Sequence, residues 1–471
     1  MIKLKNIILV HLCLLLFLAV SSVFVWHSNK SDFVVSYSQT LFFVLFFWVV
    51  MAQITLNGLL HLFTIFLGLF FLFLGGIPFL DLIGVIDIEE LFLIVHNRLS
   101  NAIYIEVYTY MSFFLMFVFL GVLFGYKSED YLKSKTEVNY SPFLFQTGVV
   151  LFFLAIPGIL TKYFLQLQVI LEKGYLAVFD GSLSQIDYPL ITVGSGTLLL
   201  FGYCLFLSSK PTKKQFLIIT AILLLTQFVN VLKGQRAVFL FPLIFSIWFY
   251  HKFYAKSLSK KKLIFSALCV VLFGQIFMVL RTTDEGHIRN LEQKSFMERY
   301  VGSFFVGQSV SFFILPYVLH YDLRNDRYPY LLAPLNIHYR SFQNMDRLQR
   351  SNTLSDQLTY RIDPNYFHRG VGVGSSIVAV FHDLRHIVAV LVSLIFGFLM
   401  ARFEIFVKYS RVLLLFAFYF VSSIMMSPRF DMLLFFYDMV VLGVLFILVN
   451  AVYRFVQTQK IIPIGIKNGD N

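Results

Sequence analysis

The sequence predicts an all-α polytopic membrane protein with about twelve transmembrane helices, cytoplasmic termini and a large extracytoplasmic loop domain between the ninth and tenth helices. The prediction rests on the apolar composition, the long apolar runs and the placement of the basic residues between them. Of the 471 residues, 58% are hydrophobic and 14% are charged, whereas a soluble chain has about 25% charged residues. A water-soluble core could not hold all 57 Phe residues. The composition therefore excludes a soluble enzyme, a disordered chain and a disulfide scaffold.

Twelve apolar runs are long enough to cross a bilayer, whose hydrocarbon core of about 30 Å needs roughly 20 helical residues. They cover residues 7–26, 37–55, 58–76, 104–125, 144–163, 189–209, 216–232, 237–253, 263–280, 387–404, 411–426 and 432–453. Only a polar break near Asn57 separates the second run from the third. A further stretch, Ser303–Leu319, is interrupted by polar residues, and we expect an interfacial or re-entrant segment there.

The first run follows Lys3 and Lys5 and therefore resembles a signal peptide. It is as long as a span, and Ala19-Val20-Ser21 is a poor cleavage site, so we expect an uncleaved transmembrane helix. Cys13, Cys204 and Cys269 all lie in apolar runs, without the spacing of a metal site or a disulfide framework.

The basic residues give the orientation. With a cytoplasmic N-terminus, nineteen basic residues fall on the cytoplasmic side, and only seven fall in the short outer connections. This asymmetry is what the positive-inside rule requires. It divides the chain into helices 1–9 (residues 1–280), an extracytoplasmic domain (281–386), and helices 10–12 with a cytoplasmic tail (387–471). A connection of this length is too long for a plain linker.

Lysine and arginine are distributed differently between the two sides. Most lysines lie on the cytoplasmic side, whereas most arginines lie outside, and eleven of these are in the long loop. Because a guanidinium binds phosphate or carboxylate through a planar fork, this pattern indicates an anionic ligand at the outer face. The alternative is that the arginines pair with the acidic residues of the same loop.

Four arginines are the best candidates for a ligand site because of their positions. Three lie at the outer ends of spans, and the fourth precedes Pro364 and a glycine-rich run: Arg236, Arg281, Arg429 and Arg361. Charges at membrane depth are costly and usually face an interior cavity. Snorkelling of the side chains to the lipid headgroups is the alternative.

A glycine-rich run, Arg369 to Ser376, precedes an apolar helix. Gly372 and Gly374 would let backbone amides approach a ligand, and Ser375 or Ser376 would cap the helix, whose N-terminus favours an anion. Beside the arginines, this run fits a diphosphate site. No Walker lysine-serine follows it, which argues against nucleotide hydrolysis.

Several ionisable side chains near this run are candidate acid or base groups. Histidine can take a proton from a hydroxyl near neutral pH, and the candidates are His368, His382, Asp383, His386 and Asp363. The segment Asp87–Glu90 is a possible divalent-metal site, although we prefer an exposed acidic patch, and no cluster has zinc spacing. We therefore expect neither a metal nor a cofactor.

At these residues the chain resembles the Wzy-type O-antigen polymerases, which join oligosaccharide repeat units. The resemblance lies in the Gly234-Gln235-Arg236 turn, Arg281 after the next span, and the long outer loop late in the chain. It also includes Gly372–Ser376 with Phe381-His382-Asp383, the spacing of Arg361 and Gly372, and Ser427-Pro428-Arg429. One departure is His382-Asp383-Leu384-Arg385, where the family more often has an aspartate-aromatic-glycine ending.

The resemblance implies a GT-C-like, metal-independent glycosyltransferase of the bacterial inner membrane, active on its outer face. The donor would be a glycan on undecaprenyl diphosphate, and the acceptor a sugar hydroxyl of a lipid-linked repeat unit. Arg236, Arg281, Arg429 and Arg361 would bind the diphosphate, with Gly372, Gly374 and Ser375 beside it. His368 or His382, next to Asp383, would accept the proton. A chain-length regulator and a flippase would be partners, and nucleic acid would not.

Three alternatives remain from the sequence. An O-antigen ligase-like enzyme would share the architecture and the leaving group but use another acceptor. A lipid-linked oligosaccharide flippase would carry charges within its spans, whereas nearly all arginines here lie at outer ends. The third is a noncatalytic structural membrane protein.

Overall fold

The computed structural model describes most of the chain as helices joined by short connections. The described residues are 31–88, 99–126, 136–173, 182–233, 237–255, 302–324, 329–333, 353–368, 372–431 and 435–460, with a few single residues elsewhere. The α-helices in this part are α2 (Asp32–Asn57), α3 (Leu62–Phe70), α4 (Gly76–Leu82), α5 (Asn101–Tyr126), α6 (Pro142–Lys173), α7 (Ser195–Ser208), α8 (Lys213–Leu232), α9 (Ala237–Phe253), α12 (Ser303–Gln308), α13 (Ile314–His320), α16 (Leu354–Ile362), α17 (Pro364–His368), α18 (Ile377–Asp383), α19 (His386–Phe406), α20 (Arg411–Met426) and α21 (Phe436–Lys460).

Short π- and 3₁₀-helical turns complete this set. The π-helical turn η1 (Phe71–Gly75) joins α3 to α4, and the 3₁₀ turns are η5 (Ser182–Gln185), η6 (Leu190–Thr192), η8 (Ser309–Phe313) and η9 (Tyr330–Leu332). The described residues include no strand. The all-α prediction is therefore confirmed for this part of the chain.

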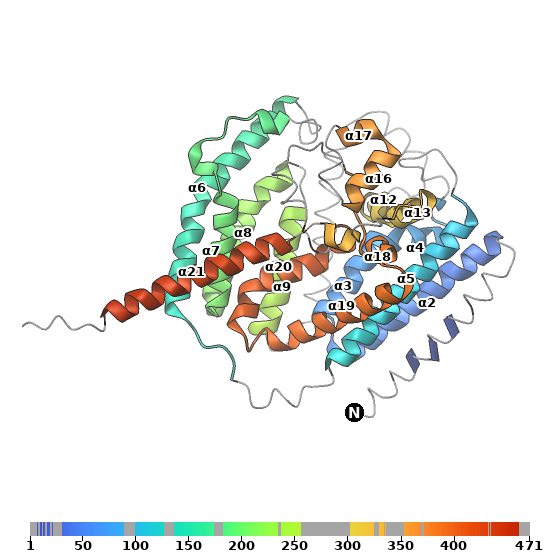
Figure 1. Ribbon diagram of the computed structural model, residues 1–471, viewed down its shortest axis with the longest axis horizontal. Helices are drawn as coiled ribbons and strands as arrows, with labels where there is room; N and C mark the ends of the chain where they lie inside the picture. Colours follow the sequence, from blue (N-terminus) through green and yellow to red (C-terminus); the bar gives the residue numbers. More distant parts are fainter. Residues whose placement is uncertain are drawn as a thin grey trace, which may run out of the picture.

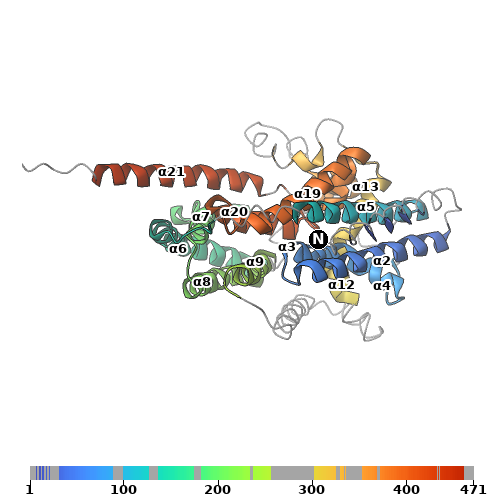
Figure 2. The same cartoon turned by 90° about the horizontal axis from the view of Figure 1, so that it is seen from below.

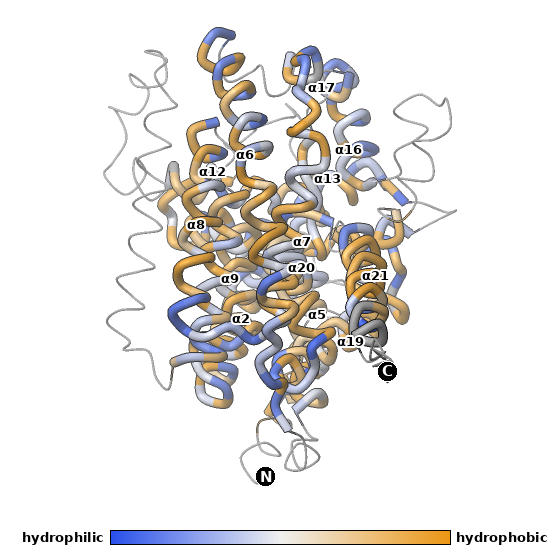
Figure 3. Tube along the Cα trace, turned by 90° about the vertical axis from the view of Figure 1, so that its left-hand side faces the viewer, coloured by the Kyte–Doolittle hydropathy of each residue, from blue (hydrophilic) through white to orange (hydrophobic). Residues whose placement is uncertain are grey.

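Eight described helical segments are long and apolar enough to cross a membrane, and three apolar helices are shorter. The eight are Asp32–Asn57, Leu62–Leu82, Asn101–Tyr126, Pro142–Lys173, Leu190–Ser208, Lys213–Leu232, Ile387–Phe406 and Phe436–Phe455. Figure 3 shows the resulting hydrophobic belt between two more hydrophilic ends. A polytopic membrane protein is confirmed. The total of twelve spans stays a prediction, because residues 263–280 and most of 7–26 lie outside the described residues.

The helices form two neighbouring groups, which Figures 1 and 2 show from two directions. One group contains α6–α9 and α20, and the other contains α2–α5, α12, α13 and α16–α19. Within the groups, glycine lets backbones touch: a Cβ on Gly397 of α19 would collide with the Val118 carbonyl of α5, and one on Gly148 of α6 with Phe206 of α7. Such small-residue contacts are typical of helix packing in membranes. Helix α21 extends along one side with little of its surface buried.

Alternate connections meet at one end of the bundle, as the sequence-based topology requires. Glu137 forms an ion pair of 2.8 Å with Lys210, and Val138 N donates to Lys408 O at 3.1 Å. Tyr254, after α9, donates to the Pro211 carbonyl at 2.7 Å. We call the end that contains these residues the lysine end.

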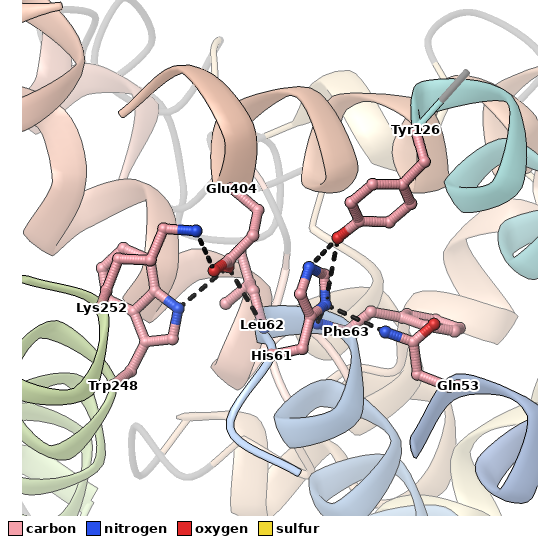
Figure 4. A network of polar contacts seen from close by, with 8 residues as sticks. All are labelled: Gln53, His61, Leu62, Phe63, Tyr126, Trp248, Lys252 and Glu404. Carbon is pink, nitrogen blue, oxygen red and sulfur yellow. Dashed lines mark hydrogen bonds and ion pairs between the residues drawn. The ribbon is translucent and has the colours of Figure 1, made fainter. Parts of the chain in front are cut away.

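A buried polar network near the lysine end links the two helix groups (Figure 4). Glu404 of α19 pairs with Lys252 of α9 at 2.8 Å and accepts from Trp248 Nε1 at 3.0 Å. Its carboxylate also accepts from Leu62 N at the start of α3, at 3.2 Å. Next to it, His61 contacts Gln53 and Tyr126. One carboxylate thus joins α19 to helices from both groups.

The opposite end of the bundle carries helices α16, α17 and α18. Helices α16 and α17 lie above α18 in Figure 1. The expected re-entrant stretch forms α12, η8 and α13, so its helix is interrupted from Ser309, where the polar residues occur. Ser309 Oγ donates to Leu72 O at 2.5 Å, which anchors the interrupted helix on η1. We call the end with α16–α18 and residues 427–431 the site end.

Candidate functional site

Two segments that are far apart in the sequence run side by side at the site end. Ser375 N donates to Arg429 O at 3.1 Å, and Ile377 N donates to Ser427 O at 3.0 Å. The turn after α20 is itself closed by Arg429 N, which donates to Met426 O at 2.9 Å. The glycine-rich run and the Ser-Pro-Arg turn, both selected from the sequence, therefore form one unit.

The glycine-rich run is held by hydrogen bonds from its own amides. Val373 N donates to Thr359 Oγ1 at 3.0 Å, and Gly374 N donates to Ser355 Oγ at 3.2 Å, both on α16. We expected the backbone amides of this run to face a ligand. The amides of Gly374 and Ser375 instead donate their hydrogen bonds to other residues of the protein. The run instead fixes the position of Arg429.

Backbone conformation explains the glycine at position 374. Gly374 has φ +88°, in the left-handed region that side chains with a Cβ rarely adopt, and the Arg429 carbonyl lies 3.5 Å from where a Cβ would be. Gly372 is exposed, and a Cβ there would lie 2.9 Å from Ser355 Oγ. Both positions thus allow close packing of the run on α16 and on the turn.

The serines after the run do not cap the next helix through their side chains. Ser376 occupies the N-cap of α18 but makes no side-chain capping bond, so that expectation was wrong. The hydroxyl oxygens of Ser375 and Ser376 are buried, and no described residue lies in hydrogen-bond geometry with them. Helix α18 itself extends only from Ile377 to Asp383, so it offers no extended helix dipole for an anion.

Arg429 is half-buried in the turn, and its guanidinium carbon lies 5.6 Å from the centre of the Phe73 ring. Phe73 belongs to the π-helical turn η1, and such turns inside helices are frequent at functional sites. The ring contact helps to position the planar guanidinium. The anion-binding role expected of Arg429 stays a prediction.

Asp431, two residues after Arg429, was missed by the sequence analysis. Its Oδ1 atom is buried and has no hydrogen-bond partner among the residues that the structure describes. Burial is the main cause that raises the pKa of Asp431; the Ser375 hydroxyl lowers this pKa and the Asp356 carboxylate raises it, and the pKa that results is about 6. A buried carboxyl with a raised pKa is a typical feature of a catalytic base or acid. The signal in the sequence was an acidic residue in a short turn between two apolar runs.

His382 and Asp383 lie on α18 and both contact neighbouring elements. His382 is buried, with its ring 4.6 Å from that of Tyr110 in an edge-to-face contact. Asp383 Oδ2 accepts from Tyr330 N at 2.7 Å, which attaches η9 to α18. These contacts make both side chains part of the support of the site.

Arg361 and His368 are exposed on the short helices above α18. Arg361 lies in the last turn of α16. Burial and the Asp383 carboxylate raise the pKa of Tyr330, whereas the charge of Arg361 lowers it, and the pKa that results is about 12. His368 ends α17 and contacts the ring of Phe367 at 5.6 Å. Arg361 therefore lies within electrostatic range of the group that binds Asp383, and His368 lies at the surface.

The structure brings together part of the predicted set. Arg429, Gly374 and Ser375 are in contact, and Asp383 and Arg361 are linked through Tyr330. Arg236 and Arg281 lie outside the described residues, as do Glu89 and Glu90. Within the described ranges, no group of three His, Cys, Asp or Glu residues could hold a metal ion.

The whole chain was compared with protein families and with known proteins. The family model described as "O-antigen polysaccharide polymerase Wzy" matches residues 7–459. No curated protein and no solved structure matches the chain. The matched range includes both the glycine-rich run and the turn that contains Arg429.

Proposed function

Because the chain belongs to the O-antigen polysaccharide polymerase Wzy family, we propose that it transfers a glycan from undecaprenyl diphosphate to a sugar hydroxyl of a lipid-linked repeat unit. The transfer would take place at the outer face of the bacterial inner membrane. One observation supports the proposal: the paired segments hold the Arg429 carbonyl on the Ser375 amide, and the Ser375 hydroxyl lies at the buried carboxyl of Asp431.

The arginines would stabilise the leaving group. As the bond between the anomeric carbon and the diphosphate oxygen breaks, its electron pair stays on the diphosphate, where negative charge grows. A preorganised guanidinium stabilises such charge without a metal ion. Arg429 would bind the diphosphate directly and Arg361 would approach from α16, with Arg236 and Arg281 as further predicted ligands.

Asp431 would act as the general base. The acceptor oxygen attacks the anomeric carbon, and its proton passes to the Asp431 carboxylate. Its pKa of about 6 keeps the group ionised near neutral pH and basic enough to accept a proton. His368, His382 and Asp383, predicted for this role, have less suitable surroundings. His368 is exposed, and the other two pack against Tyr110 and Tyr330.

Gly372, Gly374 and Ser375 would act mainly by position. The first two allow the run to pack on α16, and Ser375 holds the Arg429 carbonyl through its amide. A chain-length regulator and a flippase are proposed as partners on the family resemblance alone. They would control product length and supply the lipid-linked substrate.

The test is to incubate the purified protein with defined lipid-linked repeat units and to measure the length of the lipid-linked products. We expect longer glycans from the wild type. Arg429→Lys keeps the charge but loses the bidentate fork, so the rate should fall at least about 100-fold. The same loss is expected for Arg236→Lys.

A matched control is Arg324→Lys, because Arg324 is half-exposed and pairs with Asp322 at 3.4 Å. Its product lengths should equal those of the wild type. Wild-type chain lengths from Arg429→Lys would remove Arg429 from the mechanism. Products on a different acceptor would instead identify a ligase-like enzyme.

A reporter fusion tests the proposed orientation. A reporter at Asn325 should be active outside the cytoplasm, and one at Lys261 should be active inside it. The opposite pattern would place the Arg429 turn on the wrong face for an extracytoplasmic polymerase.

A further inference from the structure

Lys233 is a buried cation that directly follows α8, in the helix group that contains α6–α9. It is 2% exposed, and its Nζ donates to Gln166 Oε1 of α6 at 2.6 Å. The same ammonium lies 4.2 Å from the centre of the Tyr163 ring. Lys233 therefore connects the ends of α8 and α6 at the far end from the lysine end.

Polar side chains from three segments surround this lysine. Tyr163 donates to Gln227 Oε1 at 3.1 Å, and Gln166 Nε2 donates to Tyr188 Oη at 3.1 Å. A second cation, Lys162, lies 5.8 Å from the Tyr188 ring. We call Lys162, Tyr163, Gln166, Tyr188, Gln227, Asn230 and Lys233 the Lys233 cluster. Tyr163, Gln166 and Tyr188 are only half-buried, so the cluster reaches the surface.

The Lys233 cluster has positive charge but no negative charge. In the described part of the chain, neither Lys162 nor Lys233 forms an ion pair. The lysine end differs, because Lys252 and Lys210 are each paired with a glutamate at 2.8 Å. Burial and the charge of Lys162 lower the pKa of Lys233 to about 8. A buried ammonium without a counter-ion is costly and is usually retained for a reason.

Lys233 also has hydrogen-bonding capacity to spare. An ammonium has three N–H donors, and within the described residues Gln166 is the acceptor for one of them. Unused donors on a buried cation suit an anionic oxygen, since charge-assisted hydrogen bonds are the strongest kind. The next residues in the chain are Gly234-Gln235-Arg236.

We propose that the Lys233 cluster is a second anion-binding subsite, which takes a phosphate or carboxylate group of the lipid-linked substrate. The proposal rests on the proposed function, because a polymerase of this kind holds two lipid diphosphates at once. The donor diphosphate leaves, whereas the acceptor keeps its own throughout the reaction. Arg429 would bind the diphosphate of the donor, and Lys233 would bind that of the acceptor. Tyr163 and Tyr188 would contact the sugar next to the acceptor diphosphate.

Binding measurements on the intact purified protein test the subsite. Native mass spectrometry with undecaprenyl diphosphate alone should show two bound molecules in the wild type and one in Lys233→Met. The KM for the lipid-linked acceptor should rise about tenfold or more in the variant, with kcat nearly unchanged. Lys173→Met is the matched control, because Lys173 is exposed at the end of α6. It should behave as the wild type.

A second variant separates binding from folding. Gln166→Glu places a carboxylate 2.6 Å from Lys233 Nζ in the position of the present amide oxygen. It should raise the melting temperature by pairing the buried cation, and it should also remove the second bound diphosphate. A stabilised Gln166→Glu protein that still binds two molecules would overturn the proposal and leave Lys233 a structural residue.

Two further probes identify the source of the anion. Lys233-dependent binding of the lipid-free repeat-unit oligosaccharide would assign the subsite to an acidic sugar. Lys233-dependent binding of phosphatidylglycerol vesicles alone would overturn a substrate site in favour of a lipid-headgroup contact. Unchanged binding of all probes in Lys233→Met would also overturn it. Because these readouts need no turnover, they remain decisive even if the wild type does not polymerise.

Discussion

Lys233 is buried and Asp431 has a buried carboxyl oxygen, and neither residue forms an ion pair within the described part of the chain. Their charges have opposite signs, and they follow different helices, Asp431 after α20 and Lys233 after α8. Groups of this kind cluster at functional sites because their desolvation tunes reactivity and attracts ligands. At the scale of single residues, they are the two features that a purely structural membrane protein would have the least reason to keep.

The pKa of Asp431 gives a pH dependence with a definite sign. The carboxylate is the form that accepts a proton, so kcat/KM should rise with pH and level off above about pH 6. Because the Asp356 charge raises the pKa of Asp431, Asp356→Asn should move this limb to lower pH. Initial rates of glycan transfer between about pH 5 and about pH 8 measure both effects. If kcat/KM of Asp356→Asn rose over the same pH range as in the wild type, the titrating group would not be Asp431.

Asp431→Asn separates a catalytic role from a structural one. Burial raises the pKa of the folded state, so the folded protein binds this proton more tightly than the unfolded chain. Stability is therefore lost as the pH rises from about 4 to about 6, and the loss is complete above that range. At neutral pH, Asp431→Asn should melt at a higher temperature than the wild type but be inactive. A destabilised yet active variant would contradict the base assignment.

At the scale of elements, the pairing of the glycine-rich run with the turn after α20 sets the geometry of the site. Gly374 is the conformational requirement of this pairing, because its φ of +88° is costly for any residue with a Cβ. Gly374→Ala should lower the stability by about 1 kcal/mol and shift Arg429, which reduces the rate of transfer.

Gly68→Ala on α3 is the control for this substitution. Nothing lies within 4 Å of the added Cβ, so its melting temperature should not fall. Melting temperatures and transfer rates of the two variants, measured in the same detergent, make the comparison. If Gly374→Ala behaved as Gly68→Ala does, the run would not control the position of Arg429.

The sequence was informative about elements and much less so about their assembly. Apolar runs predicted α2, α5, α8 and α19 to within a few residues because hydropathy is a local property. The glycine-rich run and Arg429 were each found, but their pairing joins positions more than fifty residues apart and has no local signal. Asp431 and Lys233 were missed because their significance lies in burial and missing partners, which only the packed structure reveals.

At the scale of the whole molecule, the two helix groups are joined near the lysine end by Glu404. Its carboxylate accepts hydrogen bonds from Lys252, from Trp248 and from the amide of Leu62. Glu404→Leu leaves the half-buried ammonium of Lys252 and two buried donors without their acceptor, and breaking a buried pair costs about 3 kcal/mol or more. The melting temperature should fall clearly, although the site end is far from the change.

Adding Lys252→Met to Glu404→Leu removes the unpaired cation, so the double variant should regain part of the lost stability. Thermal unfolding of the two single variants and the double variant in detergent gives the coupling between the residues. Strictly additive losses would show that the Lys252–Glu404 ion pair does not join the helix groups energetically.

We propose that Arg429 binds the diphosphate of the donor lipid at the site end, with Asp431 as the base beside it. The most direct test is a cryo-electron microscopy structure of the purified protein with undecaprenyl diphosphate bound. We expect diphosphate density within hydrogen-bonding distance of the Arg429 guanidinium, with the Asp431 carboxylate facing the neighbouring acceptor position. Diphosphate density elsewhere, with no lipid at Arg429, would contradict it.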